Sequence, residues 1–302
     1  MTTAVEEKRA GIVGPTVVRS KDGSALVRAR ESKSQQSTQT TLFGFFDKEN
    51  GINWKTTFRV SGKQFYSPRH KHTFDQVRYF VRGSVQYGKD VYEAGTCLYL
   101  PEGVHYGPMQ PIEGMERAGI GMQFAGCSRI MFPYRSDIAK AREAMEKLGT
   151  NEKGAFRWAD GRLQDGYEAV LEHLTGRKVE YPKPRYDNYI VMHSENHAWT
   201  PLKGASGVFV KHLGYFNATG PNIKLLKIEP GAETSAGMAA FQQVRAVVEG
   251  EIDYEGENYE TVSCMYLPAH VPYSSIKSAR GATLLVVQLA ANPDEPPPFC
   301  LI

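Results

Sequence analysis

The chain of 302 residues lacks the long apolar segments that secreted and membrane proteins carry. Residues 1–11 include acidic side chains and have no apolar core segment, so they do not predict a secretory signal. No stretch approaches the roughly 18 consecutive apolar residues of a membrane-spanning helix. We therefore expect a cytoplasmic protein without a membrane partner.

Concentrated charge of one sign is also missing. The 36 basic and 33 acidic residues are spread along the chain and leave a net charge of +3. No run of Lys and Arg is suited to follow a phosphate backbone. Nucleic acid is therefore not an expected partner.

Cysteine is scarce, with four residues in the chain. Cys97 and Cys264 occupy the same position in two copies of an internal repeat, so each belongs to its own copy. We expect no disulfide between them, and we interpret both as small buried apolar residues.

The repeat is the strongest long-range signal in the sequence. Residues 74–106 recur without a gap as residues 241–273, with fifteen identities in 33 positions. Such similarity indicates internal duplication, which sets the number of main domains at two. The identical residues of the first copy are Phe74, Gln76, Val77, Arg78, Val81, Gly83, Tyr87, Tyr92, Glu93, Cys97, Tyr99, Leu100, Pro101, Val104 and Tyr106.

Short segments rich in Val, Ile, Tyr, Phe and Thr fill both halves, and Gly, Pro, Asn and Asp separate them. This spacing predicts antiparallel strands in a sandwich or barrel. Between the halves, residues 136–149 and 163–174 have the composition and capping residues of helices, and two prolines at 182 and 184 predict an extended connector. The strands expected in the first half are 41–46, 56–60, 77–81, 84–87, 96–100 and 120–124.

These patterns divide the chain into five parts. We expect residues 1–15 to form a flexible arm, 16–126 an N-terminal domain, 127–186 a helical linker, 187–291 a C-terminal domain and 292–302 a Pro-rich tail. The tail cannot join the interior of a sheet.

Two histidines mark the first copy as a candidate metal site. His70 and His72 are spaced i, i+2, so on a strand they project from one face. Gln76 follows, and His105 comes after Pro101-Glu102-Gly103. Three imidazoles and an amide oxygen can hold a divalent metal, such as Zn, Fe, Mn or Ni.

These motifs resemble those of the cupin superfamily. Its first motif has two His one residue apart, then Glu and later Gly, and here Gln76 stands in the Glu position before Gly83. Its second motif has Pro-x-Gly followed by a His, and His105 lies one residue closer than usual. The resemblance implies an all-β bicupin, with two double-stranded β-helix or jelly-roll barrels and a helical segment between them. The counterparts of His70, His72 and His105 in the second copy are Gly237, Ala239 and Pro272, so only the first barrel is expected to bind metal.

The ligand set favours a reaction class. Three neutral imidazoles and one amide leave the charge of the metal uncancelled by protein and leave positions open for substrate oxygens. The resemblance implies that members with three His and one Gln run redox-neutral Lewis-acid chemistry, as lyases, cyclases and related enzymes do, whereas members with Glu include many dioxygenases. We therefore expect a metal-dependent lyase, isomerase or cyclase acting on a small oxygenated or carbonyl compound.

Two alternatives stay open. One is a metal-dependent dioxygenase, and the other is a cupin that binds a small molecule without turnover. A homodimer is expected in either case, because barrel domains have exposed edges and the second barrel has no other evident use.

Further side chains are candidates for the same pocket, each with a structural alternative. Asp75 and Tyr106 are candidate proton carriers, although Asp75 also fits a loop facing water. Arg78, Tyr66 and Tyr99 are candidate substrate contacts. Several of these residues recur in the second copy, which equally suits a structural role: Gln76, Arg78, Tyr99 and Tyr106 reappear as Gln243, Arg245, Tyr266 and Tyr273.

Overall fold

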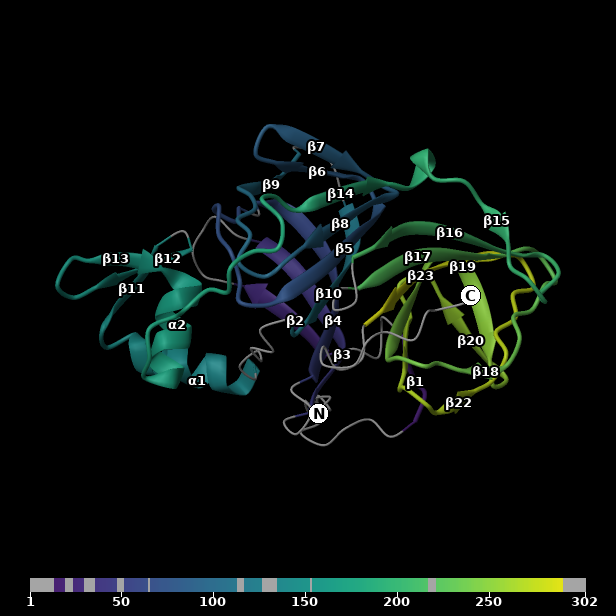
Figure 1. Cartoon of the computed structure of the whole chain (residues 1–302). Helices are drawn as coiled ribbons and strands as arrows, with labels where there is room; N and C mark the ends of the chain where they lie inside the picture. Colours follow the sequence, from purple (N-terminus) through teal and green to yellow (C-terminus); the bar gives the residue numbers. More distant parts are fainter. Residues whose placement is uncertain are drawn as a thin grey trace.

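The chain folds into two antiparallel barrels with a small insertion at the far side of the first (Figure 1). This computed structural model describes residues 14–19, 24–29, 36–47, 52–64, 66–112, 117–126, 135–152, 154–216 and 221–289. Strands dominate the described residues, which confirms the predicted all-β class. The N-terminal arm up to residue 13 and the tail from residue 292 lie outside the described residues.

The first barrel is built on one large sheet, in the order β14-β8-β5-β10-β4-β3-β2, and a smaller one, β7-β6-β9. Its strands are β2 (Ser24–Ala29), β3 (Gln36–Asp47), β4 (Ile52–Gln64), β5 (Asp75–Arg82), β6 (Ser84–Tyr87), β7 (Asp90–Glu93), β8 (Thr96–Leu100), β9 (Met109–Pro111) and β10 (Arg117–Phe124).

The second barrel repeats this plan with the sheet β1-β21-β19-β23-β17-β16-β15, to which β20 adds by pairing with β19, and the pair β18-β22. Its strands are β15 (Thr200–Pro201), β16 (Val208–Tyr215), β17 (Asn222–Ile228), β18 (Gly237–Met238), β19 (Gln243–Tyr254), β20 (Glu257–Glu260), β21 (Cys264–Leu267), β22 (Pro272–Tyr273) and β23 (Ala282–Gln288).

Strand register shows that the sequence repeat is a structural one. Gln76 lies opposite Leu100 where β5 pairs with β8, and Gln243 lies opposite Leu267 where β19 pairs with β21. The equivalent cysteines, Cys97 and Cys264, are both buried with free thiols, as expected.

Each barrel receives one strand from the segment that precedes the other barrel. β1 (Thr16–Val18) comes before the first barrel but pairs with β21 of the second. β14 (Ile190–His193) comes before the second barrel but pairs with β8 of the first. The two strands therefore cover the equivalent edges of β8 and β21, which would otherwise expose unpaired backbone groups.

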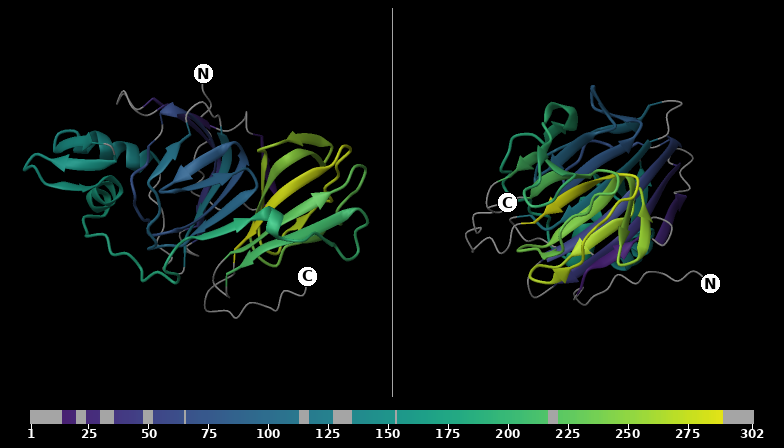
Figure 2. Two further views of the ribbon diagram at one scale, coloured as in Figure 1. Left: turned by 90° about the horizontal axis from the view of Figure 1, so that it is seen from above. Right: turned by 90° about the vertical axis from the view of Figure 1, so that its right-hand side faces the viewer.

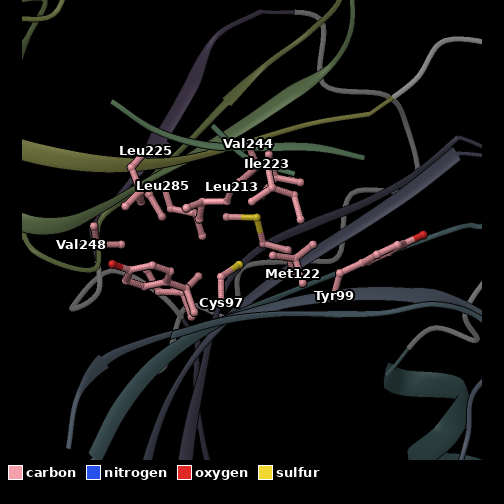
Figure 3. Packing of buried hydrophobic residues seen from close by; sticks show 14 of the residues in the cluster. Cys97, Tyr99, Met122, Leu213, Ile223, Leu225, Val244, Val248 and Leu285 are labelled. Atoms are coloured by element: carbon pink, nitrogen blue, oxygen red, sulfur yellow. The ribbon is translucent and has the colours of Figure 1, made fainter. Parts of the chain in front are cut away.

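A shared apolar layer joins the two barrels (Figure 3). Val77 and Tyr79 of β5 belong to it, together with Val244 and Leu285 of the second barrel. Because side chains alternate along a strand, the other residues of β5, Gln76 and Arg78, face the interior of the first barrel. The top view shows the order insertion, first barrel, second barrel (Figure 2).

The insertion contains two helices and a three-stranded sheet. α1 (Arg135–Met145) and α2 (Gly166–Thr175) lie close to the predicted helices. The small sheet was not predicted; it consists of β11 (Gly149–Glu152), β12 (Ala155–Trp158) and β13 (Leu163–Asp165). Phe156 of β12 and Met145 of α1 are buried together in its core, which the short polar strands do not reveal in sequence.

A buried ion pair attaches the connector to the first barrel. The Asp75 carboxylate is 1% exposed and accepts hydrogen bonds from Tyr99 Oη at 2.7 Å and from Arg185 Nη2 at 3.1 Å. Burial, partly offset by Tyr99 and Arg185, raises the pKa of Asp75 to about 6. The positive charge of Arg185 therefore stabilises the ionised form of Asp75, which burial among apolar side chains disfavours.

Among the described residues, no helix has the length and apolar character needed to span a membrane.

We expect Arg185→Leu to lower the free energy of unfolding by about 3 kcal/mol at pH 7, because the buried Asp75 carboxylate loses its cation. The raised pKa of Asp75 means that its favourable contribution is full below pH 3.8 and is lost as the pH rises through about 6. At pH 5 the Asp75 carboxyl is mostly neutral in both the parent and Arg185→Leu. The difference between their free energies of unfolding should therefore be smaller at pH 5 than at pH 7. Urea unfolding at pH 5 and pH 7 measures this, with the exposed Arg162→Leu as control. An equal loss at both pH values would contradict the role assigned to Asp75.

Candidate functional site

The histidine pair lies in the segment that leads into β5. His70 is held by two backbone hydrogen bonds with Tyr106, of 3.1 and 2.9 Å. The imidazole rings of His70 and His72 have centroids 4.9 Å apart and lie nearly perpendicular to each other. The predicted pair on one face is therefore present.

Hydrogen bonding determines which nitrogen of His70 carries the proton. Its Nδ1 lies 2.6 Å from the Pro68 carbonyl oxygen, which can only accept. Nδ1 is therefore protonated, and in the neutral ring the lone pair is on Nε2. This orientation is typical of a histidine that binds a metal or accepts a proton through Nε2.

A second set of hydrogen bonds surrounds His72. Arg78 Nη2 donates to Gln76 Oε1 at 3.0 Å and to Tyr106 Oη at 3.2 Å. Because a guanidinium only donates, the amide oxygen of Gln76 must face Arg78. The Gln76 Nε2 group then faces Tyr106 Oη and His72 Nδ1, each at 2.9 Å.

These contacts fix the direction of the Tyr106 proton. Tyr106 Oη accepts from Arg78 and Gln76, so its own hydrogen points to His72 Nδ1, 2.7 Å away. His72 Nδ1 is thus an acceptor, and the neutral ring carries its proton on Nε2. Arg78, Tyr106 and His72 form a continuous series in which a phenol can exchange its proton with an imidazole beside a cation.

Part of this network recurs in the second barrel, which lacks the histidines. Arg245 donates to Gln243 Oε1 at 2.9 and 3.1 Å. Its guanidinium carbon lies 4.8 Å from the centre of the Tyr273 ring, and the Arg78 carbon lies 4.9 Å from that of Tyr106. The Gln, Arg and Tyr positions therefore form a structural core common to both barrels, as the repeat suggested.

His105 does not join the other histidines. It is exposed, and partial burial together with the positive charges of Arg69 and Lys71 lowers its pKa. The adjacent Tyr106, which stands at the usual distance from the Pro-x-Gly motif, points inward to His72 instead. The shorter spacing of His105 thus places it on the outer side of the segment, because neighbouring extended residues point to opposite sides.

The predicted ligand set of His70, His72, Gln76 and His105 is consequently not assembled among the described residues. In the described part of the chain, no three His, Cys, Asp or Glu side chains are grouped as metal ligands. The Gln76 oxygen, its only ligating atom, is held by the cationic Arg78. The donor set therefore does not fit the metal site that the motifs predicted.

Two other candidates face away from the interior of the first barrel. Asp75 and Tyr99 face the apolar layer between the barrels and hydrogen-bond to each other rather than to the barrel interior. Their predicted roles as base and substrate contact are not favoured by these positions. The expectation of Asp75 in a loop facing water was also wrong, since it is buried. Tyr66 is 40% exposed.

Two neighbours of the site were not found from the sequence. Tyr167, at the start of α2, packs edge-on against His72 with ring centroids 4.8 Å apart and hydrogen-bonds to Thr73. Its contact depends on how the insertion docks, which no local pattern predicts. Gln123 of β10 donates to Gln76. Along β10, glycine or polar residues alternate with apolar ones. This pattern could have predicted that Gln123 lies on the same face of the strand as Gly119 and Gly121.

Comparison with solved structures gives similarity over most of the chain. A putative dioxygenase from Nostoc punctiforme is similar at TM-score 0.61 and 14% identity, covering 92% of this chain and 83% of that one. Oxalate decarboxylase from Bacillus subtilis, described with Mn(II) centres, is similar at 0.55 and 15%, covering 94% and 79%. HEPD from Streptomyces albus, with 2-hydroxyethylphosphonate and Fe(II) bound, is similar at 0.55 and 13%, covering 93% and 77%. No family model and no curated protein matches the chain.

We expect His72 to be a neutral imidazole protonated on Nε2, with Nδ1 accepting from Tyr106. Long-range ¹H–¹⁵N NMR correlation of the histidine rings measures this directly. In Tyr106→Phe the acceptor nitrogen loses a donor, so its ¹⁵N shift should move, whereas the exposed His105 ring should be unchanged. A His72 ring protonated on Nδ1 would contradict the assigned direction of the Tyr106 proton.

Proposed function

We propose that this chain, in which both halves have the cupin fold, is an enzyme whose first barrel converts a small oxygenated or carbonyl compound by redox-neutral lyase, isomerase or cyclase chemistry. The observation that supports this is the series from Arg78 through Tyr106 to His72. The second barrel has the equivalent arginine and tyrosine, Arg245 and Tyr273, but no counterpart of His72.

The chemistry follows from the positions of the protons. A substrate oxygen beside Tyr106 Oη can take the phenolic proton, and the guanidinium of Arg78 stabilises the phenolate that remains. His72 Nδ1 lies 2.7 Å from Tyr106 Oη, so the ring can take up a proton that the substrate loses and pass it to the phenolate, which restores the phenol. Gln76 keeps the phenol oriented through its amide nitrogen.

Tyr106→Phe should lower kcat/KM by about 100-fold or more, because it removes the proton donor and keeps the packing of the ring. Consumption of small hydroxy acids, oxo acids and aldehydes, followed by NMR, gives the activity to be measured. Tyr273→Phe is the matched control, since it makes the same change at the equivalent position of the second barrel. Full activity in Tyr106→Phe would contradict the proposed chemistry. Binding of compounds without turnover would instead support a non-enzymatic cupin.

A metal-dependent reaction, including an oxygen-consuming one, is the second candidate. The observation that favours it is the His70–His72 pair, with Nδ1 of His70 bonded to a carbonyl so that Nε2 is left as the ligating atom. Two similar structures are described with Mn(II) or Fe(II). His70 would hold such an ion through Nε2, and His72 would do so only in the tautomer that carries its proton on Nδ1. Tyr106, rather than His105, is the next polar group beside them.

Elemental analysis of untagged protein by plasma mass spectrometry separates the candidates. The metal-dependent candidate predicts about one equivalent of a divalent metal per chain, lost in His70→Ala/His72→Ala. We expect His105→Ala to keep whatever metal the parent holds, because His105 faces outward. Loss of metal in His105→Ala would show that the ligand set predicted from sequence does form. With iron bound, activity that disappears without oxygen would identify the oxygenase.

A further inference from the structure

The insertion, which lies beside the first barrel (Figure 1), contacts the segment that carries the two histidines. Gly154 is packed so closely against Pro68 that a Cβ atom on this glycine would lie 2.7 Å from the proline ring. At the other end of the segment, Tyr167 Oη and Thr73 Oγ1 are hydrogen-bonded at 2.8 Å. The insertion therefore packs along the histidine segment, from its beginning to its end.

Tyr167 also restrains the imidazole ring of His72. Phe74 stacks on that ring, with centroids 4.4 Å apart and an interplanar angle of 20°. The Tyr167 ring lies 4.8 Å from His72 at an interplanar angle of 82°. Because the Phe74 and Tyr167 centroids are 6.1 Å apart, these two rings approach the imidazole from different directions. Together they limit both its displacement and its rotation.

The two restraining rings have different origins. Phe74 recurs in the second barrel as Phe241, where the counterpart of His72 is Ala239, so the stacking ring belongs to the fold common to both barrels. Tyr167 lies outside the repeated residues and comes from α2, which is held by the core of the insertion. The barrel that has the histidines therefore receives a ring that the repeat does not supply.

The orientation of the imidazole decides whether it can exchange a proton with the phenol. His72 Nδ1 faces Tyr106 Oη at 2.7 Å. Rotation about the Cβ–Cγ bond of the histidine would move Nδ1 away from this oxygen, and a hydrogen bond weakens steeply as its angle departs from the preferred range. Groups that react together must be held within about 0.5 Å of the productive geometry by the side chains around them.

We propose that Tyr167 is a positioning residue, through which the insertion holds the His72 imidazole within hydrogen-bond distance of Tyr106. The Tyr167 ring restrains the imidazole, and the hydrogen bond to Thr73 anchors that ring. Tyr167 acts through His72 and carries no proton itself. The effect on turnover rests on the proposed function, whereas the orientation of His72 is measurable without a substrate.

Long-range ¹H–¹⁵N NMR correlation of the histidine rings tests this orientation. In Tyr167→Ala we expect the Nδ1 resonance of His72 to lose the shift caused by the Tyr106 hydrogen bond, because the imidazole adopts other orientations. Tyr167→Phe keeps the ring and should give the parent spectrum. Val170→Ala is the matched control, since it removes a buried side chain of the same helix that packs in the core of the insertion. An unchanged His72 spectrum in Tyr167→Ala, or the same change in Val170→Ala, would overturn the proposal.

Tyr167→Leu separates loss of the ring from loss of docking, because leucine keeps an apolar side chain between the insertion and the barrel. We expect this variant to change the His72 spectrum as Tyr167→Ala does, with a Tm close to that of the parent. The parent spectrum in Tyr167→Leu would show that any apolar side chain suffices, which would overturn the role of the aromatic ring.

Kinetic measurements distinguish the failure of this proposal from the failure of the proposed function. For an enzyme that acts as proposed, Tyr167→Ala should lower kcat about tenfold and change KM by less than about twofold, whereas Tyr167→Phe should keep the parent activity. A lower kcat without a change at His72 would keep the enzyme and reject the positioning role. A change at His72 in a protein that converts no compound would reject the enzymatic function and keep the positioning role.

Discussion

The apolar layer between the two barrels is the constraint on which the rest of the structure depends. It commits one face of β5 to the partner barrel through Val77 and Tyr79. Because strand side chains alternate, Gln76 and Arg78 are then directed into the barrel, where each has hydrogen-bonding partners. A slip of one residue would bury the guanidinium of Arg78 in the apolar layer, so the register of the site is fixed by packing that lies outside it.

The duplicated Gln, Arg and Tyr positions give the two barrels a common core with different surroundings. In the second barrel this core supports the strands, and apolar residues fill the remaining volume. In the first barrel the same groups meet His70 and His72, and Gly119 and Gly121 of β10, opposite Phe80 and Arg78, line an open volume. The difference between the barrels therefore comes from a few substitutions around an unchanged hydrogen-bonding pair.

Sequence patterns predicted the fold well, because duplication, strand periodicity and helix caps are local or repeated signals. They also brought His70 and His72 together correctly, since the i, i+2 spacing fixes a shared face. They misplaced Asp75, whose burial depends on a second barrel packing against β5 and on Arg185 arriving from a distant connector. His105 resembled a ligand by its residue type, but strand alternation gives the inward position to Tyr106.

The exchanged strands β1 and β14 make the two halves dependent on each other. A gene fragment that encodes either half alone would produce a sheet that lacks its outermost strand and exposes the apolar face that its partner covers. Loss of the second barrel would thus uncover the apolar face of β5 in the first barrel. The second barrel is therefore required for the fold of the first, independently of any chemistry of its own.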